Sequence, residues 1–263
     1  SRGMGALEFA PTLAERPTTN QLLDVGALVE LASLVLQRRQ DLDTRLDADG
    51  LATILSVGTS AGGARAKAVG AWNPSTGELR SGQLDAPAGF EHWLLKFDGV
   101  QGNRDRELAD PMGFGRIEYA YHLMARRAGI TMTDCRLHEE GGRAHFMTRR
   151  FDRTPDGDKL HLQSLCGIAH KDFNQAGAYS YEQAFRVTRR LSLPQPDSAQ
   201  LYRRALFNIL ARNQDDHTKN IAFLMDRSGT WHLAPAYDVI YSYNPSGAWT
   251  SRHQMSLRGK RDD

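Results

Sequence analysis

The stretch NQDDHTKNIAFLMDRSGTWHLAPAYDVI, residues 213–240, contains the side chains of this chain that are best suited to chemistry. Asp215 and Asn220 are separated by four residues, and Asp238 follows after a segment with the pattern of a short hairpin. A carboxylate can accept a proton from an attacking hydroxyl, and carboxylate and amide oxygens bind Mg²⁺. We therefore expect these three side chains to meet around one divalent cation that also holds a nucleotide triphosphate.

Phosphoryl transfer from a nucleotide needs these groups, and it also needs a cation and backbone amides that hold the phosphates. Protein kinases place a base Asp, four intervening residues and a metal-binding Asn in one loop, with a second metal-binding Asp further along the chain. The alternative is a solvated turn with Asx caps, because Asp-x-x-x-x-Asn spacing is common. The hairpin pattern and the returning Asp238 favour the kinase interpretation.

A phosphate anchor can be sought upstream. Lys96 lies inside the apolar segment His92–Phe97, which predicts a strand. A lysine there is either an edge residue that reaches water or a buried cation with an anionic partner. Glu118, in the predicted helix Arg116–Ala128, is a candidate partner, although an acid near a helix N-terminus explains it equally well. The Gly- and Ala-rich stretch Val57–Lys67 is not a Walker A loop, but its small residues could let backbone amides approach phosphate oxygens.

The sequence predicts both strands and helices that would position these groups, and their proportion changes along the chain. The predicted elements are a helix at Leu22–Gln40, strands at Lys67–Trp72, His92–Phe97 and Ala144–Arg153, helices at Arg116–Ala128, Tyr181–Leu191 and Gln200–Arg212, and a hairpin at residues 221–234. Strands with one helix come first, and mostly helices follow. This order predicts an α+β fold of two lobes, a β-rich N-terminal lobe at residues 1–152 and a mainly helical C-terminal lobe at residues 153–263.

Composition excludes several classes of protein. The 33 Lys plus Arg nearly balance the 31 Asp plus Glu, so we expect no direct nucleic-acid binding. The most apolar stretch, Leu22–Gln37, is interrupted by acidic residues and is shorter than the roughly 20 apolar residues that cross a bilayer. The chain opens without a secretion signal, and Cys135 and Cys166 lie too far apart in sequence for a C-x-x-C pair. A reducing, cytoplasmic setting is therefore expected.

With these residues in place, the sequence resembles the HipA-like kinases, the serine/threonine kinase toxins of bacterial toxin–antitoxin systems. The segments that carry the resemblance are GALEFAP, SAGGARAK, LLKF, IEYAYHLMARRAGI, RRFDR, LHLQSLCGIA, NQDDHTKNIAFL and LAPAYDVI, and they span most of the chain. The most specific is the Asp-x-His-x-Lys-Asn core that begins at Asp215, with the later pair Tyr237-Asp238. The resemblance implies a two-lobed protein-kinase-like fold with ATP and Mg²⁺ between the lobes.

The resemblance also implies roles for individual residues. Asp215 corresponds to the catalytic base, and Lys96 to the phosphate-anchoring lysine. The other implied site residues are His217 and Lys219 in the catalytic loop, Asn220 and Asp238 as Mg²⁺ ligands, Phe151 and Tyr237 at the adenine pocket, and Ser60, Ala61, Gly62 and Gly63 in the phosphate-binding loop. Ser60 falls at the family's autophosphorylated serine. A phosphate there would repel the nucleotide phosphates, which should eject the loop and switch the enzyme off.

The sequence departs from the family at three places. Arg149 stands where the family motif often has Glu, which puts a side-chain contact with adenine in doubt. The family's extra N-terminal β subdomain and the final helices of its second lobe are not recognised, so we expect a fragment of a longer protein. The family implies a protein substrate, such as an aminoacyl-tRNA synthetase or another translation factor, and a DNA-binding antitoxin partner.

Other functions remain open. A kinase-like small-molecule phosphotransferase would use the same base and metal ligands, with a substrate cleft lined by Lys67 and arginines. A catalytically silent antitoxin-binding module would show no magnesium-dependent stabilisation by ATP. A metal-dependent phosphodiesterase would use the cluster Asp215-Asp216-His217 and would hydrolyse its substrate without ATP. Four basic doublets, Arg126-Arg127, Arg149-Arg150, Arg189-Arg190 and Arg203-Arg204, are interpreted as charged faces of exposed elements.

Overall fold

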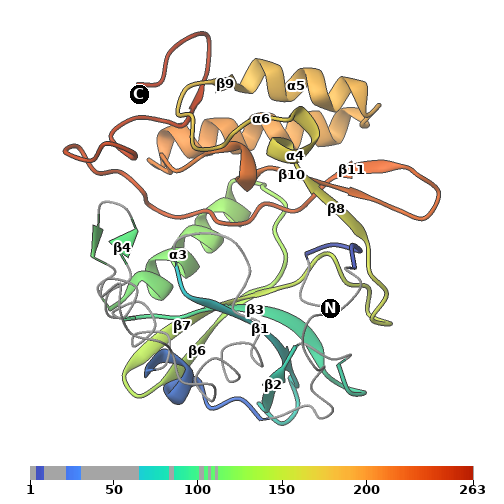
Figure 1. The fold of residues 1–263 in the computed structure, drawn as a ribbon, viewed down its shortest axis with the longest axis vertical. Helices are drawn as coiled ribbons and strands as arrows, with labels where there is room; N and C mark the ends of the chain where they lie inside the picture. Colours follow the sequence, from blue (N-terminus) through green and yellow to red (C-terminus); the bar gives the residue numbers. More distant parts are fainter. Residues whose placement is uncertain are drawn as a thin grey trace, which may run out of the picture. The chain divides into compact units, whose positions relative to one another are not determined.

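The chain forms two compact units in the computed structural model, which describes residues 4–8, 22–30, 65–82, 86–100, 104–105, 108–109 and 112–262. The first unit comprises Ser1–Tyr119 and Asp134–Asp158, and the second comprises Ala120–Thr133 and Lys159–Asp263. The chain therefore passes from one unit to the other after Tyr119, after Thr133 and after Asp158, whereas the sequence suggested a single join after residue 152. An antiparallel sheet and several helices confirm the predicted α+β class (Figure 1).

The first unit is built on a five-stranded antiparallel sheet with the order β2-β1-β3-β7-β6. Its strands are β1 (Lys67–Trp72), β2 (Leu79–Ser81), β3 (Glu91–Lys96), β6 (Cys135–Glu140) and β7 (Arg143–Arg149), and a separate pair is formed by β4 (Arg104–Asp105) and β5 (Leu108–Ala109). The predicted strands at Lys67–Trp72 and His92–Phe97 are confirmed to within one residue. The sequence missed β6 because this edge strand is polar and partly exposed, so it lacks an apolar run.

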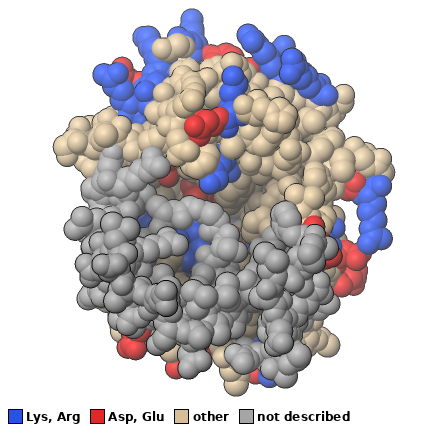
Figure 2. Space-filling model, viewed as in Figure 1, with Lys and Arg blue, Asp and Glu red and all other residues tan. Residues whose placement is uncertain are grey.

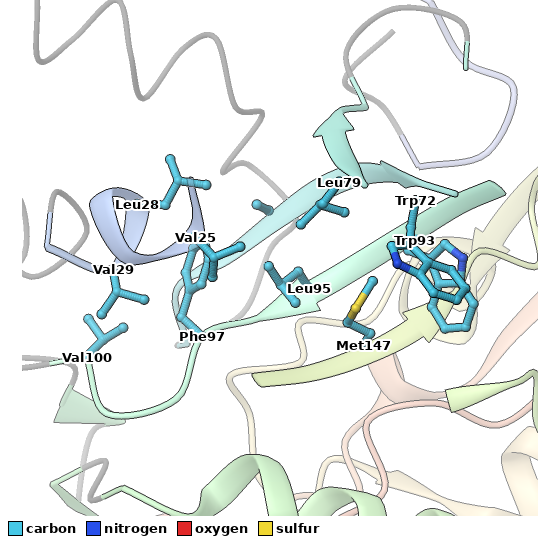
Figure 3. Close-up of a cluster of buried hydrophobic side chains, with 11 residues drawn as sticks. Val25, Leu28, Val29, Trp72, Leu79, Trp93, Leu95, Phe97, Val100 and Met147 are labelled. Atoms are coloured by element: carbon cyan, nitrogen blue, oxygen red, sulfur yellow. The ribbon is translucent and has the colours of Figure 1, made fainter. Parts of the chain in front are cut away.

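The core of the first unit lies against this sheet (Figure 3). The rings of Trp72 and Trp93 meet edge to face, with centroids 5.5 Å apart. Residues 25–30 are helical and direct the buried side chains of Val25 and Val29 into the same cluster. Of the helix predicted at Leu22–Gln40, residues 31–40 lie outside the described residues. The cluster consists of Val25, Leu28, Val29, Ala68, Trp72, Leu79, Trp93, Leu95, Phe97, Val100 and Met147.

The first residues of helix α3 (Phe114–Arg127) pack very closely against the backbone of this sheet. A Cβ atom on Gly115 would lie 1.9 Å from the carbonyl oxygen of Ala144, so only glycine allows this approach. The buried carboxylate of Asp98 accepts hydrogen bonds from the backbone N–H groups of Gly113, at 2.9 and 3.1 Å, and Ala144, at 3.2 Å. These contacts fix the start of α3 and therefore the position of Glu118 in its second turn.

The segment that follows β7 forms hydrogen bonds with the N-terminal residues that the structure describes. The carboxylate of Asp152, which is 1% exposed, accepts two hydrogen bonds from the guanidinium of Arg150, at 2.9 and 2.7 Å. The same carboxylate accepts the backbone N–H of Gly5 at 2.6 Å, and Arg153 donates to the Gly5 carbonyl at 3.1 Å. The buried charges are thus paired, and the chain near Gly5 is fixed beside Phe151.

The second unit contains three further α-helices and two small sheets. Its elements are α4 (Leu165–Ala169), α5 (Tyr181–Arg190), α6 (Gln195–Leu210), the 3₁₀ turn η1 (Thr218–Asn220), the sheet β11 (Trp231–Leu233), β10 (Ala222–Met225) and β8 (His161–Ser164), and the parallel pair β12 (Met255–Ser256) and β9 (Tyr179–Ser180). The predicted hairpin is confirmed as β10 and β11. Helix α5 begins at a capping box made by Ser180 and Gln183, as the sequence pattern favours.

Helix α6 starts five residues before the predicted Gln200, at a proline-marked N-terminus where Pro194 is the N-cap. The core beneath these helices includes Leu165, Leu201 and Phe223, each 0% exposed. The core holds the two strands of the hairpin against α5 and α6. This packing fixes where the loop that contains Asp215 enters β10 and where the segment that contains Asp238 leaves β11. Within the part of the chain that the structure describes, no helix is long and apolar enough to cross a bilayer.

Candidate active site

Lys96 is a buried cation with an anionic partner, one of the two possibilities that the sequence left open. It ends β3 and is 6% exposed, and its Nζ lies 2.5 Å from Oε1 of Glu118, which is 2% exposed. The ammonium also lies 5.8 Å from the ring centroid of Phe146 on β7. A lysine held in this way keeps its charge at a fixed position, as a phosphate anchor requires.

Other basic side chains gather near this pair. Lys67 on β1 is directly opposite Lys96 in the sheet register, so both side chains leave the sheet on the same face, and both are buried. Arg65 stacks its guanidinium over the ring of Phe114 at 4.2 Å and lies 3.8 Å from the second carboxylate oxygen of Glu118. Like charges placed opposite each other in a sheet repel, and an anion with several charges would relieve this repulsion.

In the second unit, the catalytic-loop candidate Asp215 is held at both its backbone and its carboxylate. The η1 turn curls the loop, and Nδ2 of Asn220 donates to the backbone carbonyl of Asp215 at 2.9 Å. The indole Nε1 of Trp249 donates to Oδ1 of Asp215 at 2.7 Å. His217 Nε2 lies 3.7 Å from the same oxygen, which is longer than a hydrogen bond. The Asp215 side chain is 31% exposed, so solvent or a substrate hydroxyl can approach it.

The side chain of Asp216, next to Asp215, is buried and hydrogen-bonded within the protein. It is 2% exposed, and its carboxylate accepts the hydroxyl of Tyr181 at 2.7 Å and the backbone N–H of Gln254 at 2.7 Å. Burial and the neighbouring charge of Asp216 raise the pKa of Tyr181, so its hydroxyl stays a donor. The carboxylate is therefore committed to holding the loop. This arrangement does not support the phosphodiesterase alternative, which needs Asp215, Asp216 and His217 to face one metal.

Lys219 and His217 both pack on Phe173, a residue that the sequence did not indicate. The Lys219 ammonium lies 3.8 Å from the ring centroid of Phe173, and the imidazole of His217 meets the same ring edge to face at 5.7 Å. A cation over an aromatic face is attracted to the ring's negative electrostatic potential. The ring thus supports the two basic side chains of the loop from one side.

The hairpin returns the chain at Tyr237 to the candidate catalytic loop that contains Asp215 and Lys219. The backbone N–H of Ala236 donates to the carbonyl of Thr131 at 2.8 Å, and the hydroxyl of Tyr237 donates to the carbonyl of Lys219 at 2.5 Å. Burial and the charge of Asp238 raise the pKa of Tyr237 above its ordinary value. Asp238 itself has a φ of +56°, a conformation that is uncommon for residues other than glycine and that often occurs at functional sites.

Asn220, before the hairpin, and Asp238, after it, carry oxygen donors of the kind that Mg²⁺ prefers. With Nδ2 of Asn220 donating to Asp215, its Oδ1 is the atom that can meet a cation, and Asp238 supplies a carboxylate oxygen. Oxygen donors suit Mg²⁺, which commonly takes one or two protein ligands together with water and substrate phosphates. Among the described residues, no group of three or more His, Cys, Asp and Glu side chains could hold a metal by itself.

The remaining predicted site residues lie in the first unit or outside the described part. Phe151 is half-buried, and its two neighbours in the sequence, Arg150 and Asp152, form an ion pair. Arg149 lies near two carboxylates, that of Glu91 at 3.3 Å and that of Asp134 at 3.8 Å. The phosphate-binding-loop candidates Ser60, Ala61, Gly62 and Gly63 lie outside the residues that the structure describes.

The basic doublets separate into two kinds. Arg150 and Arg204 are buried, at 5% and 7% exposure, and Arg204 donates to the carbonyl of Ala234 at 2.7 Å. The interpretation as exposed charged faces is therefore wrong for one member of each of these two doublets. Arg189 and Arg190 are exposed at the end of α5, and Figure 2 shows basic side chains gathered over this part of the second unit.

Comparison with known proteins identifies relatives. The chain is 28% identical over 126 residues to "Putative kinase Y4mE" and 26% identical over 164 residues to "Putative kinase Y4dM", both of Sinorhizobium fredii. These matches cover 44% and 56% of the chain but only 30% and 37% of the relatives, so the chain spans about a third of their length.

The fold also matches a solved structure, the complex of HipA, HipB and operator DNA from a Shewanella oneidensis toxin–antitoxin system. The TM-score is 0.64 at 19% sequence identity, and the match covers 98% of this chain and 59% of that one. The likeness shows a HipA kinase-like fold. The family model described as the HipA-like C-terminal domain matches residues 59–263, which is most of the chain. The chain belongs to the HipA-like C-terminal domain family.

Proposed function

We propose that this chain is the catalytic part of an enzyme that transfers the γ-phosphoryl group of ATP, with Mg²⁺, to a serine or threonine hydroxyl of a protein. The observation that carries the proposal is the buried pair of Lys96 and Glu118, 2.5 Å apart. A buried ion pair adds little net stability, so a role in binding is a better explanation than a role in folding. Membership of the HipA-like family and the kinase names of two relatives support the same function.

The residues then take the following parts. Lys96 contacts the nucleotide phosphates, and Glu118 keeps its ammonium in place. Asn220 and Asp238 would hold Mg²⁺ through oxygen atoms, and the ion would supply positive charge that neutralises the phosphates. Asp215 accepts the proton of the substrate hydroxyl as the hydroxyl oxygen bonds to the γ-phosphorus and the bond to ADP breaks. Lys219, positioned on Phe173, adds positive charge beside the reacting phosphoryl group.

The biological setting extends this proposal. The solved relative is a complex with HipB and operator DNA, and we propose a comparable antitoxin partner for the protein that contains this chain, acting in the cytoplasm. A translation factor such as an aminoacyl-tRNA synthetase is the proposed class of substrate. Ser60 is the proposed site of autophosphorylation, where added negative charge would switch the enzyme off.

A second candidate function is phosphorylation of a small molecule. The gathering of Lys67, Lys96 and Arg65 near one carboxylate favours it, because an anionic small substrate could also bind there. The two functions differ in the group that accepts the phosphoryl group, a protein hydroxyl in the first and a small molecule in the second. A silent antitoxin-binding module is a third candidate, and it would bind no ATP.

The test is to incubate the protein with γ-labelled ATP, with and without Mg²⁺, and with casein as a general protein acceptor. The proposal predicts magnesium-dependent label on serine or threonine of the protein itself or of casein. Label found only on added free alcohols would support the small-molecule candidate. Absence of labelling together with no thermal stabilisation by ATP and Mg²⁺ would support the silent module.

A further inference from the structure

Trp249 contacts the carboxylate that we propose as the base. Its indole Nε1 donates a hydrogen bond of 2.7 Å to Oδ1 of Asp215, from a position 34 residues later in the chain. An indole N–H only donates, so it cannot take the substrate proton from Asp215. A permanent donor on one carboxylate oxygen restricts rotation of the side chain without competing in proton transfer.

The segment that carries Trp249 is fixed by contacts of its own. The backbone N–H of Gln254 donates to the buried carboxylate of Asp216 at 2.7 Å. The side-chain amide of Gln254 donates to the backbone carbonyls of Trp249 and Arg252. Directly after it, β12 pairs with β9 in parallel register. The backbone that carries the indole is therefore held in place independently of the contact between the indole and Asp215.

A proposed base with a partly exposed side chain needs such a restraint. Asn220 binds the backbone carbonyl of Asp215 and not its carboxylate, and the orientation of a carboxylate depends on two side-chain torsions that a bond to the backbone does not fix. Proton acceptance requires the carboxylate to point at the attacking hydroxyl within hydrogen-bond reach. His217, at 3.7 Å from Oδ1, is too distant to replace the indole as a hydrogen-bond donor.

We infer that Trp249 is a positioning residue that orients the Asp215 carboxylate for proton acceptance. This inference rests on the proposed function, since it assumes that Asp215 is the base. It assigns a role to the segment between Asp238 and β12 that neither the loop spacing nor the hairpin pattern indicated. The segment holds both acids of the loop, Asp215 through an indole and Asp216 through a backbone amide.

The kinetic test compares Trp249→Phe with wild type. Phenylalanine keeps an aromatic ring and removes the N–H. We expect kcat for casein phosphorylation to fall roughly 10- to 100-fold, because a small displacement of a reacting group can cost about 100-fold in rate. The Kd for ATP with Mg²⁺ should stay within about twofold, since Trp249 does not hold the nucleotide. Trp231→Phe, which changes a half-buried tryptophan on β11 outside the loop, is the matched control and should keep wild-type kcat.

A second measurement does not depend on activity. The four tryptophans give four indole N–H signals in an ¹⁵N spectrum, and the signal lost in Trp249→Phe identifies Trp249. Asp215→Asn should shift this signal and accelerate its exchange with solvent, because an amide oxygen accepts a weaker hydrogen bond than a carboxylate. Asp226→Asn, in the exposed hairpin turn, should leave the signal unchanged.

The results distinguish a failure of the inference about Trp249 from a failure of the proposed function. If wild type is active and Asp215→Asn is not, but Trp249→Phe has wild-type kcat, the inference is overturned and the function stands. If wild type transfers no phosphate, the proposed function fails. Should Trp249→Phe not fold, triple-resonance assignment of wild type identifies the Trp249 indole signal and the spectrum of Asp215→Asn decides: an unmoved Trp249 signal overturns the inference, and a shifted one supports it.

Discussion

Lys96 and Glu118 form a buried ion pair, with 2.5 Å between Nζ and Oε1. Its geometry depends on the position of α3, since Glu118 lies in the second turn of that helix. The start of α3 is in turn fixed by two features of the first unit, the carboxylate of Asp98 and the absence of a side chain at Gly115. The proposed phosphate anchor is thus connected to the packing of a helix on a sheet.

The substitution Lys96→Met should abolish most activity. The proposed anchor is lost, and we expect kcat/KM to fall roughly 100- to 1,000-fold, the usual cost of removing one preorganised group that stabilises transition-state charge. The free energy of unfolding should also fall by about 1–3 kcal/mol, because Glu118 loses a hydrogen-bonded partner. Steady-state kinetics and urea unfolding measure the two effects. Lys260→Met, at an exposed position, is the control, and near-normal kcat/KM in Lys96→Met would refute the anchor role.

The substitution Gly115→Ala should destabilise the first unit. The added Cβ would lie 1.9 Å from the carbonyl oxygen of Ala144, so either α3 or β7 must move. We expect a loss of about 2–4 kcal/mol in the free energy of unfolding, which is typical of severe overpacking. In Gly26→Ala, the nearest atom to the new Cβ is a side-chain oxygen of Asp24 at 3.3 Å, and the change should stay below about 1 kcal/mol. Equal losses in both variants would contradict the close approach.

The stability of the first unit should depend on pH through His145. This imidazole is 1% exposed, and its Nδ1 accepts the backbone N–H of Asp98 at 3.0 Å. Burial lowers the pKa of His145 from 6.5 to about 4. As pH falls through this window, the unfolded chain binds a proton before the folded chain does, so stability is full above pH 6.5 and decreases toward pH 4.

We expect the free energy of unfolding to fall by about 2 kcal/mol between roughly pH 7 and pH 5 on account of His145. The variant His145→Asn keeps an acceptor near the Nδ1 position and removes the titration. Urea unfolding of both proteins at the two pH values measures the difference. If the variant shows the same pH dependence as wild type, His145 is not its source.

Local patterns predicted much of the fold. The start of α5 at Tyr181, the hairpin and the apolar strands β1 and β3 each depend on residues close together in the sequence, and the structure has all of them. The candidate pair of Lys96 and Glu118 could also be named, because a lysine in an apolar strand needs a partner.

Contacts between distant residues could not be predicted in this way. Asp152 binds Gly5 across 147 residues, and Trp249 binds Asp215 across 34, and no periodicity or spacing rule connects such positions. The polar edge strand β6 was missed because its pairing with β7, rather than its composition, makes it a strand.

Asp215 is proposed to accept the substrate proton in phosphoryl transfer. This role is tested most directly by the rate of phosphate transfer from γ-labelled ATP to casein by wild type, Asp215→Asn and Asp226→Asn. We expect a loss of about 1,000-fold or more in Asp215→Asn, with ATP binding retained, and a wild-type rate in Asp226→Asn. Wild-type transfer by Asp215→Asn would contradict it.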